Sequence, residues 1–228
     1  MKQLPLDFGL AAVPRLENFI AQGNEAAVWH VQQAVANPQR AAVPTYLWGE
    51  TGSGKSHVLQ AVVTALREQG EPVGWLDAQT LHPAAFDDRW QAVVLDDCHL
   101  FTPHQQAVAF NWFVNAQTPT QGRPRWVLAA GALPPADLKL REDLRTRLGW
   151  GQVFHVQALA DAGRQTVLRR AAEERGLHLS DEVMAFMANR FSRDLSSLMH
   201  LLEHLDQYAL RTQRAITIPL IKSMLENE

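Results

Sequence analysis

The sequence predicts an α/β P-loop domain built on a five-stranded parallel sheet, followed by a small α-helical domain. Five short and nearly continuous apolar runs alternate with helical stretches, which is typical of parallel strands covered on both faces. A glycine-rich stretch, GETGSGKS, stands between one such run and a helical one. Beyond residue 157 only helical spacing remains. We therefore expect a flexible tail at 1–14, an α/β domain at 15–157 and a helical domain at 158–228.

Each expected strand is a short run rich in β-branched or aromatic residues. A helix over 24–36 comes before the first run, and the stretch HVLQAVVTALREQG that follows the glycines forms the next helix. The runs are PTYLW (44–48), VGWLD (73–77), AVVLD (92–96), RWVLA (125–129) and VFHV (153–156).

The helical domain is expected to contain four helices. Asp161 could cap a helix to Arg175, with Gly176 as its stop signal. Ser180 could cap a second helix to about residue 191, and Thr217 a last one. A third helix, over about 194–211, carries one apolar stripe made of Leu195, Leu198, Leu202, Leu205 and Ala209.

Composition limits the function classes. The 228 residues are 46% hydrophobic and carry a net charge of -3, so a large core is expected and the basic footprint of a sequence-specific DNA binder is missing. We see no secretory signal in residues 1–30 and no membrane-spanning run. The single cysteine, Cys98, cannot form an internal disulfide and is interpreted as a buried thiol. These features favour a cytoplasmic protein.

The stretch 49–56 fits the pattern G-x-x-x-x-G-K-[ST], a phosphate-binding loop. Its glycines let the backbone N–H groups surround phosphate oxygens, while the lysine adds a cation and the final hydroxyl ligates Mg²⁺. A strand before it and a helix after it make coincidence much rarer. ATP or ADP with Mg²⁺ is the expected ligand. The expected nucleotide-binding residues are Gly49, Glu50, Thr51, Gly52, Ser53, Gly54, Lys55, Ser56 and, in the first helical turn, His57.

The run AVVLDD (92–97) is an apolar strand that ends in two acids. Next to a phosphate loop this is the Walker B arrangement, in which Asp96 would hold Mg²⁺ together with Ser56, and Asp97 would orient or deprotonate the attacking water. Alone, the pattern would be read as solvated carboxylates at a strand end. Paired with the loop, it predicts a nucleotide site.

Four stretches together resemble the AAA+ proteins of the DnaA clade. They are LENFIAQGN (16–24), GETGSGKS, AVVLDD and LRTRLGWG (144–151), and the resemblance covers almost the whole chain. It implies an AAA+ domain followed by a helical lid, and it implies that Phe19 and Ile20 touch the adenine.

Within the clade, the sequence resembles a regulator more than the initiator DnaA itself. The chain ends at Glu228, without the residues for the initiator's DNA-binding domain, and the stretch 79–91 is too short for its extra helical pair. The resemblance implies that a glutamine-led N-terminal peptide binds the DNA polymerase III β sliding clamp. Gln3, Leu4, Leu6 and Phe8 would be its contact residues, in the pattern Q-x-x-L-x-F. The alternative is that this tail packs on its own domain.

Arg147 falls where the clade carries an arginine finger, and Arg145 could share its role. The resemblance implies an adaptor that presents Arg147 in trans to DnaA-bound ATP, stimulates its hydrolysis and so prevents re-initiation, with weak self-association at most. Without the resemblance, a surface arginine in a mixed-charge run would be favoured.

Two departures from the clade concern the residues that read the γ-phosphate. After the fourth strand stand Ala129, Ala130 and Gly131, where polar residues are usual, and Ser196 replaces an arginine for which Arg193 could substitute. We therefore expect a poor intrinsic ATPase that holds its nucleotide as a structural ligand.

Two other functions remain open, and one further pattern is weighed against them. A helicase loader would need a larger N-terminal extension, and a stand-alone P-loop ATPase or kinase should turn over without partners. His200 and His204 also match H-x-x-E-H, but a third zinc ligand is not evident, so zinc is disfavoured.

Overall fold

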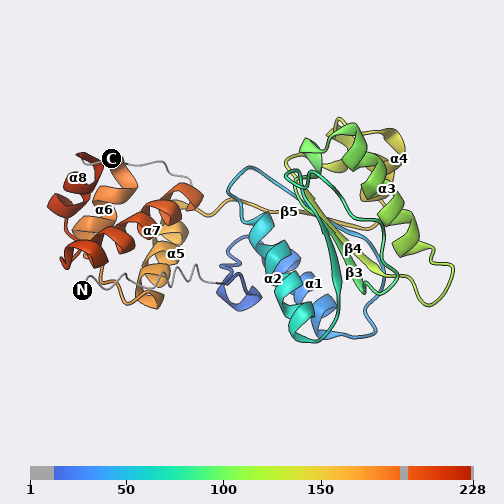
Figure 1. Cartoon of the computed structure of the whole chain (residues 1–228), viewed down its shortest axis with the longest axis horizontal. Helices are drawn as coiled ribbons and strands as arrows, with labels where there is room; N and C mark the ends of the chain where they lie inside the picture. Colours follow the sequence, from blue (N-terminus) through green and yellow to red (C-terminus); the bar gives the residue numbers. More distant parts are fainter. Residues whose placement is uncertain (1–12, 191–194, 227–228) are drawn as a thin grey trace, which may run out of the picture. The chain divides into compact units, whose positions relative to one another are not determined.

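The computed structural model describes residues 13–190 and 195–226. The chain forms two compact units, one over Pro14–Ala158 and the other in the helical segment from Leu159 on. The first is the α/β unit and the second the helical unit (Figure 1). Among the described residues, no helix combines the length and apolar character that crossing a membrane would need.

The α/β unit contains a five-stranded, fully parallel sheet in the order β2-β3-β4-β1-β5, which confirms the predicted fold class. The central β4 pairs with β1 on one side and β3 on the other. Because all strands run the same way, their carboxyl ends meet at one edge, where α/β proteins bind ligands. The strands are β1 (Thr45–Trp48), β2 (Val73–Leu76), β3 (Ala92–Leu95), β4 (Trp126–Gly131) and β5 (Gln152–His155).

Helices cover both faces of this sheet (Figure 1). On one face α1 (Glu25–Ala36) and α2 (Lys55–Glu68) close a core around Leu47 and Val94. On the other, α3 (Pro103–Gln117) and α4 (Glu142–Leu148) close a second core. Three short 3₁₀ helices lie in the connections, at Leu16–Asn18 (η1), Cys98–Leu100 (η2) and Pro135–Asp137 (η3). Cys98 is fully buried, as expected.

The edge strand β5 departs from the expectation that every strand is covered on both faces. Among the described strands it pairs with β1 only, and three of its four residues are exposed. Edge strands have one free side, so their side chains meet fewer neighbours. Two contacts still anchor it: His155 stacks on Trp48 with ring centres 4.0 Å apart, and the buried Asn24 exchanges two hydrogen bonds with the backbone of Gln157.

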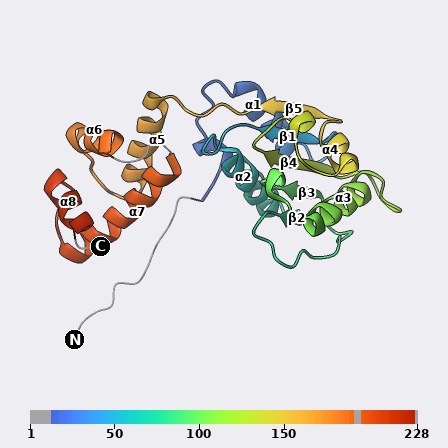
Figure 2. The same cartoon turned by 90° about the horizontal axis from the view of Figure 1, so that it is seen from above.

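The helical unit contains α5 (Asp161–Glu174), α6 (Asp181–Arg190), α7 (Leu195–Thr212) and α8 (Ile218–Glu226) (Figure 2). The predicted stripe on α7 faces its core, where Leu198, Leu202, Leu205 and Ala209 are buried. The hydroxyls of Ser180 and Thr217 accept hydrogen bonds from backbone N–H groups of the first turns of α6 and α8, so both act as caps.

One predicted cap was wrong. Asp161 is the first residue of α5, and Ala160 occupies the N-cap position. The Asp161 carboxylate instead pairs with Arg164 one turn further along the helix.

Candidate nucleotide site

The phosphate loop lies at the carboxyl end of β1 and leads directly into α2. Gly52 and Gly54 adopt left-handed conformations, with φ of +79° and +96°, which glycine reaches without steric cost. A Cβ on Gly54 would stand 2.7 Å from Cε2 of Phe19, and one on Gly49 would stand 2.2 Å from the carbonyl oxygen of Val156. The loop therefore needs glycine at Gly52 for conformation, at Gly49 for space, and at Gly54 for both.

Lys55 is buried at the centre of the loop. Its Nζ donates hydrogen bonds to the carbonyl oxygens of Gly49 and Glu50, each at 2.8 Å, and to the Ser53 hydroxyl at 3.3 Å. Burial lowers the pKa of Lys55, and the carboxylates of Asp97 and Asp96 act in the opposite direction. A cation held in this way is placed to meet the phosphates of a nucleotide.

The two acids after β3 have different surroundings. Asp96 is buried, and its Oδ1 accepts the backbone N–H of Asp97 at 2.9 Å. Burial raises the pKa of Asp96, and a hydrogen bond with the side chain of Ser56 opposes that shift. Asp97 is half-buried in a left-handed conformation with φ of 49°.

A hydroxyl and a carboxylate in contact are the oxygen ligands that Mg²⁺ takes in nucleotide sites. The pair of Ser56 and Asp96 therefore fits the expected metal ion. When bound, that ion would neutralise charge on the phosphate oxygens.

The segment that precedes α1 packs on the first turn of α2. Nε2 of His57 lies 2.8 Å from Oδ1 of Asn18, and the His57 ring centre lies 5.8 Å from that of Phe19. Phe19 and Ile20 are half-buried. Arg15 pairs with Glu68 at 2.6 Å. The structure thus brings Phe19 and His57 beside the phosphate loop.

The carboxyl end of β4 presents no polar side chain. Ala129 and Ala130 are buried, and Gly131 leaves room for the Tyr46 hydroxyl, which would lie 2.2 Å from an added Cβ. The next residue, Ala132, donates its backbone N–H to Nδ1 of His99 at 3.3 Å. We did not predict a role for His99. Its one available signal was its position in the turn directly after the two acids.

Arg147 lies in the last turn of α4, where its guanidinium contacts aromatic rings rather than the phosphate loop. Its Cζ is 4.8 Å from the ring centre of Trp150, 5.1 Å from that of Phe110 and 5.9 Å from that of Phe113. The residue is half-buried and forms no ion pair with the described part of the chain. Arg145, two residues earlier, is also half-buried.

Several predicted residues cannot be placed. Gln3, Leu4, Leu6 and Phe8 lie outside the described residues, as does Arg193. The backbone of Ser196 belongs to α7.

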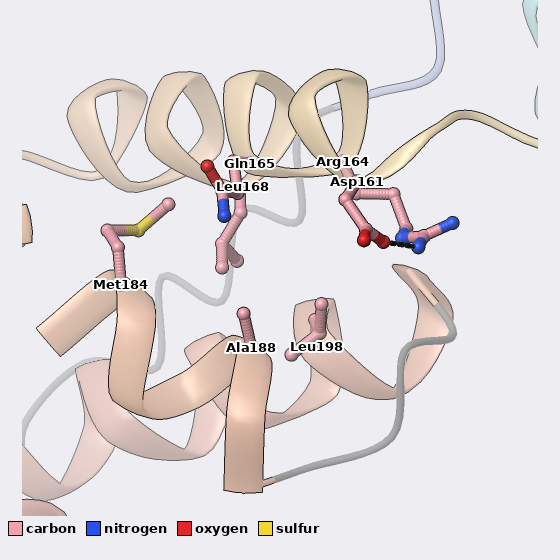
Figure 3. Close-up of a pocket in the computed structure, with 7 residues that line it drawn as sticks. All are labelled: Asp161, Arg164, Gln165, Leu168, Met184, Ala188 and Leu198. Atoms are coloured by element: carbon pink, nitrogen blue, oxygen red, sulfur yellow. Dashed lines mark hydrogen bonds and ion pairs between the residues drawn. The ribbon is translucent and has the colours of Figure 1, made fainter.

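A pocket of about 100 Å³ lies inside the helical unit, between α5, α6 and α7 (Figure 3). Leu168, Met184 and Leu198 line its apolar part, and the ion pair between Arg164 and Asp161 stands at one end. None of the residues predicted to bind nucleotide lines it.

Comparisons with known proteins agree with this geometry. The family model of the bacterial DnaA ATPase domain matches residues 12–82, and that of the Hda lid domain matches residues 161–225. An uncharacterized protein of Haemophilus influenzae is 29% identical over 231 residues, covering 98% of each chain.

Two solved structures share the fold. Domain III of the replication initiation protein DnaA from Thermotoga maritima superposes with a TM-score of 0.76 at 18% identity, covering 95% of this chain and 97% of that one. AMPPCP-bound DnaA from Aquifex aeolicus superposes with a TM-score of 0.68 at 21% identity, covering 91% of this chain and 71% of that one.

The parallel sheet, the phosphate loop, the paired acids and the helical unit that follows define an AAA+ nucleotide-binding fold. With both family models matched in order along the chain, the molecule is an Hda-like AAA+ protein, a DnaA-related replication regulator.

Proposed function

We propose that this chain is an adaptor that couples the sliding clamp to the inactivation of DnaA. In this proposal the N-terminal peptide binds the clamp, the chain's own phosphate loop holds ATP or ADP with Mg²⁺, and Arg147 acts on ATP bound to DnaA. The observation that carries the proposal is the environment of the Arg147 side chain. It is a half-buried guanidinium held by aromatic rings, without an ion pair among residues 13–190 and 195–226.

The geometry of the phosphate loop supports the part of the proposal that concerns the chain's own nucleotide. Lys55 is held by two carbonyls of the loop, and Ser56 meets Asp96 in the arrangement that suits Mg²⁺. DnaA from Aquifex aeolicus, with which the chain shares its fold, was solved with AMPPCP bound. Phe19 and Ile20 are proposed to contact the base, because Phe19 packs against the start of α2 at Gly54.

The physical role proposed for Arg147 is electrostatic. Negative charge builds on the γ-phosphoryl oxygens as the bond to the leaving group breaks, and a guanidinium placed there stabilises the transition state. Such fingers raise hydrolysis rates by about 10³–10⁵-fold. A planar guanidinium with five N–H donors suits this task better than the point charge of a lysine.

The clamp peptide is proposed from its residue pattern. Gln3 would hydrogen-bond at the rim of an apolar pocket that takes Leu6 and Phe8, and ordering a short extended peptide makes such an anchor modest in strength. The DNA-loaded clamp would then concentrate Arg147 near its target.

The test is a reconstituted reaction that contains this protein, DNA-loaded clamp and ATP-bound DnaA, in which phosphate release is measured with each component omitted in turn. We expect rapid release only with all three present. The double substitution Gln3→Ala with Leu6→Ala should remove clamp binding in a pull-down while nucleotide affinity stays unchanged.

Two outcomes would contradict this proposal. Brisk hydrolysis by the protein alone would indicate a stand-alone ATPase. Capture of the replicative helicase in place of the clamp would indicate a helicase loader.

A further inference from the structure

The segment that leads toward α1 is fixed to the end of α2 by an ion pair. Both terminal nitrogens of Arg15 donate to the carboxylate of Glu68, Nη1 to Oε2 at 3.2 Å and Nη2 to Oε1 at 2.6 Å. Two parallel bonds of this kind hold a defined geometry. Glu68 is the last residue of α2, and Arg15 stands directly before η1. The pair therefore joins the start of the segment to the helix that follows the phosphate loop.

A second contact ties the same segment to the first turn of α2. Nε2 of His57 lies 2.8 Å from Oδ1 of Asn18 and 3.2 Å from the carbonyl oxygen of Arg15. Both partners are acceptors, so the imidazole carries its hydrogen on Nε2 and donates. The same Oδ1 also accepts the backbone N–H of Arg15 at 3.0 Å. We call Arg15, Asn18, His57 and Glu68 together the clasp.

The clasp adjoins the phosphate loop. Phe19, the residue after Asn18, packs so closely on the loop that a Cβ on Gly54 would stand 2.7 Å from its Cε2. The Phe19 ring centre lies 5.8 Å from that of His57, which directly follows Ser56. In the proposed site a nucleotide contacts both sides of the clasp, the start of α2 through its phosphates and Phe19 through its base. A bound nucleotide would therefore hold the two sides together.

The clasp also sets the point at which the N-terminal peptide is attached. The stretch from Phe8, the last proposed clamp residue, to Arg15 extends to at most about 25 Å. If the segment from Arg15 to Ile20 detaches from α2, the next anchor is Asn24, which is buried and exchanges two hydrogen bonds with the backbone of Gln157. The stretch from Phe8 to Asn24 extends to about 55 Å. An open clasp would thus double the reach of the peptide.

We propose that nucleotide binding closes the clasp, so that the nucleotide in this chain's own site controls the reach of the N-terminal peptide. Binding and closure are linked, so each favours the other by the same factor. A shorter connection raises the effective concentration of the α/β unit beside the peptide's partner. Asn18 and Glu68 are positioning residues in this inference. It rests on the proposed nucleotide site and adds regulation of the proposed clamp peptide.

The test is limited digestion with trypsin, which cleaves after Arg15 only when that side chain leaves Glu68 and enters the protease. The full-length protein is digested with and without ADP and Mg²⁺, at an ADP concentration that calorimetry shows to be saturating. Mass spectrometry follows the loss of residues 1–15. Cleavage after Lys2, which is not part of the clasp, is the internal reference. When opening is fast relative to cleavage, the rate follows the open population.

Three variants and a control separate the contacts. Asn18→Ala removes the acceptor of the bond from His57, and Asn18→Asp keeps an acceptor oxygen in its place. Glu68→Ala removes the carboxylate at the other end of the clasp, about 16 Å further along α2 than His57. Glu174→Ala is the matched control, because Glu174 forms an exposed pair with Arg170 in the helical unit.

In the wild type we expect ADP with Mg²⁺ to slow cleavage after Arg15 by about fivefold or more relative to cleavage after Lys2. Without nucleotide, Asn18→Ala should be cleaved after Arg15 about two- to tenfold faster than the wild type, the range for one lost hydrogen bond. Glu68→Ala should have a smaller effect, about two- to fivefold, because its pair is exposed. Asn18→Asp and Glu174→Ala should match the wild type.

Three results would overturn the inference. The first is an unchanged ratio of the two cleavage rates when ADP saturates the wild type. The second is cleavage of Asn18→Ala and Glu68→Ala at the wild-type rate. The third is an acceleration in both variants that appears equally after Arg67, inside α2, because it would indicate general unfolding and not local opening.

The outcomes also separate this inference from the proposed function, because the digestion uses the protein without clamp or DnaA. A protein that shows the protection but does not stimulate DnaA would contradict the adaptor function and leave the clasp intact. ADP that binds without slowing cleavage would overturn the clasp and leave the adaptor function standing. A wild type that binds no nucleotide would overturn both.

Discussion

The guanidinium carbon of Arg147 lies 4.8 Å from the ring centre of Trp150, and the tryptophan itself is 61% exposed. Cation–π contacts at exposed sites contribute only about 0.5–1 kcal/mol. The contact is therefore strong enough to orient the arginine and weak enough to release it into another site. The ring centre of Phe110, which belongs to α3, lies 5.1 Å from the same carbon and gives the side chain a second aromatic contact.

Removing the ring of Trp150 should reduce the action of Arg147 without unfolding the protein. We expect Trp150→Ala to lower the stimulation of DnaA-bound ATP hydrolysis by about two- to fivefold, because a less ordered arginine must be positioned in the transition state. Trp150→Phe should retain most of the activity. Phosphate release measures the effect, and clamp affinity serves as the control. Equal activity of Trp150→Ala and the wild type would show that the ring does not position Arg147.

The contact between Ser56 and Asp96 predicts how the site responds to metal. We expect Mg²⁺ to strengthen ADP binding by the wild type, and Ser56→Ala to lose about tenfold or more of metal affinity. Without metal, in EDTA, the variant and the wild type should bind ADP equally. A fluorescent ADP analogue reports both constants. If Ser56→Ala keeps the full response to Mg²⁺, the metal is not held by this pair.

The stability of the α/β unit should depend on pH through His57. Burial lowers the pKa of His57 below its ordinary value, and a hydrogen bond with the backbone of Arg15 opposes that shift. The unfolded chain therefore binds a proton before the folded one does. The contribution of His57 to stability is complete above about pH 6.5, and it is lost as the pH falls from there to the pKa that His57 has in the folded chain.

We expect His57→Gln to flatten this dependence. Urea unfolding at several pH values between about 5 and 7.5 measures it, followed by tryptophan fluorescence. All seven tryptophans precede Leu159, so the signal reports the α/β unit. His30 and His99 also have pKa values lowered by burial and contribute with the same sign. The exposed His104→Gln is the control, and an identical slope in His57→Gln and the wild type would contradict the prediction.

Alanine substitutions at Gly54 and Gly122 separate the cost of backbone strain from the cost of steric overlap. Both have positive φ, +96° and +81°, but only at Gly54 would an added Cβ meet another atom, Cε2 of Phe19 at 2.7 Å. Gly122→Ala should cost about 1 kcal/mol of unfolding free energy, from strain alone. Gly54→Ala should cost about 2–3 kcal/mol and abolish nucleotide binding. Equal costs would mean that Phe19 moves aside freely.

Most of the fold followed from local patterns. The apolar runs identified all five strands, because central parallel strands are apolar along their whole length. The same rule was wrong about the burial of β5, because a residue pattern does not state which strand lies at the edge. Ser180 and Thr217 were found as caps, whereas Asp161 is not one, because α5 begins at Asp161 itself and Ala160 occupies the N-cap position.

The candidate site also contains residues that the sequence predicted and residues that it did not. Lys55, Ser56 and the two acids are recognisable because backbone geometry fixes their spacing along the chain. His99 was missed because its place at the end of β4 depends on a contact with Ala132, 33 residues away. The aromatic contacts of Arg147 with Phe110 and Phe113 likewise join two helices, α4 and α3, that only the folded chain brings together.

The most direct test of the adaptor proposal is single-turnover phosphate release from ATP-bound DnaA on DNA-loaded clamp, comparing the wild type with Arg147→Ala. Arg211→Ala is the matched control, because Arg211 also stacks on a ring, that of Tyr208 at 5.9 Å, but belongs to the helical unit. We expect Arg147→Ala to keep wild-type affinity for the clamp and to lose about 10³-fold in stimulation, while Arg211→Ala stays active. Stimulation by Arg147→Ala at the wild-type rate would contradict it.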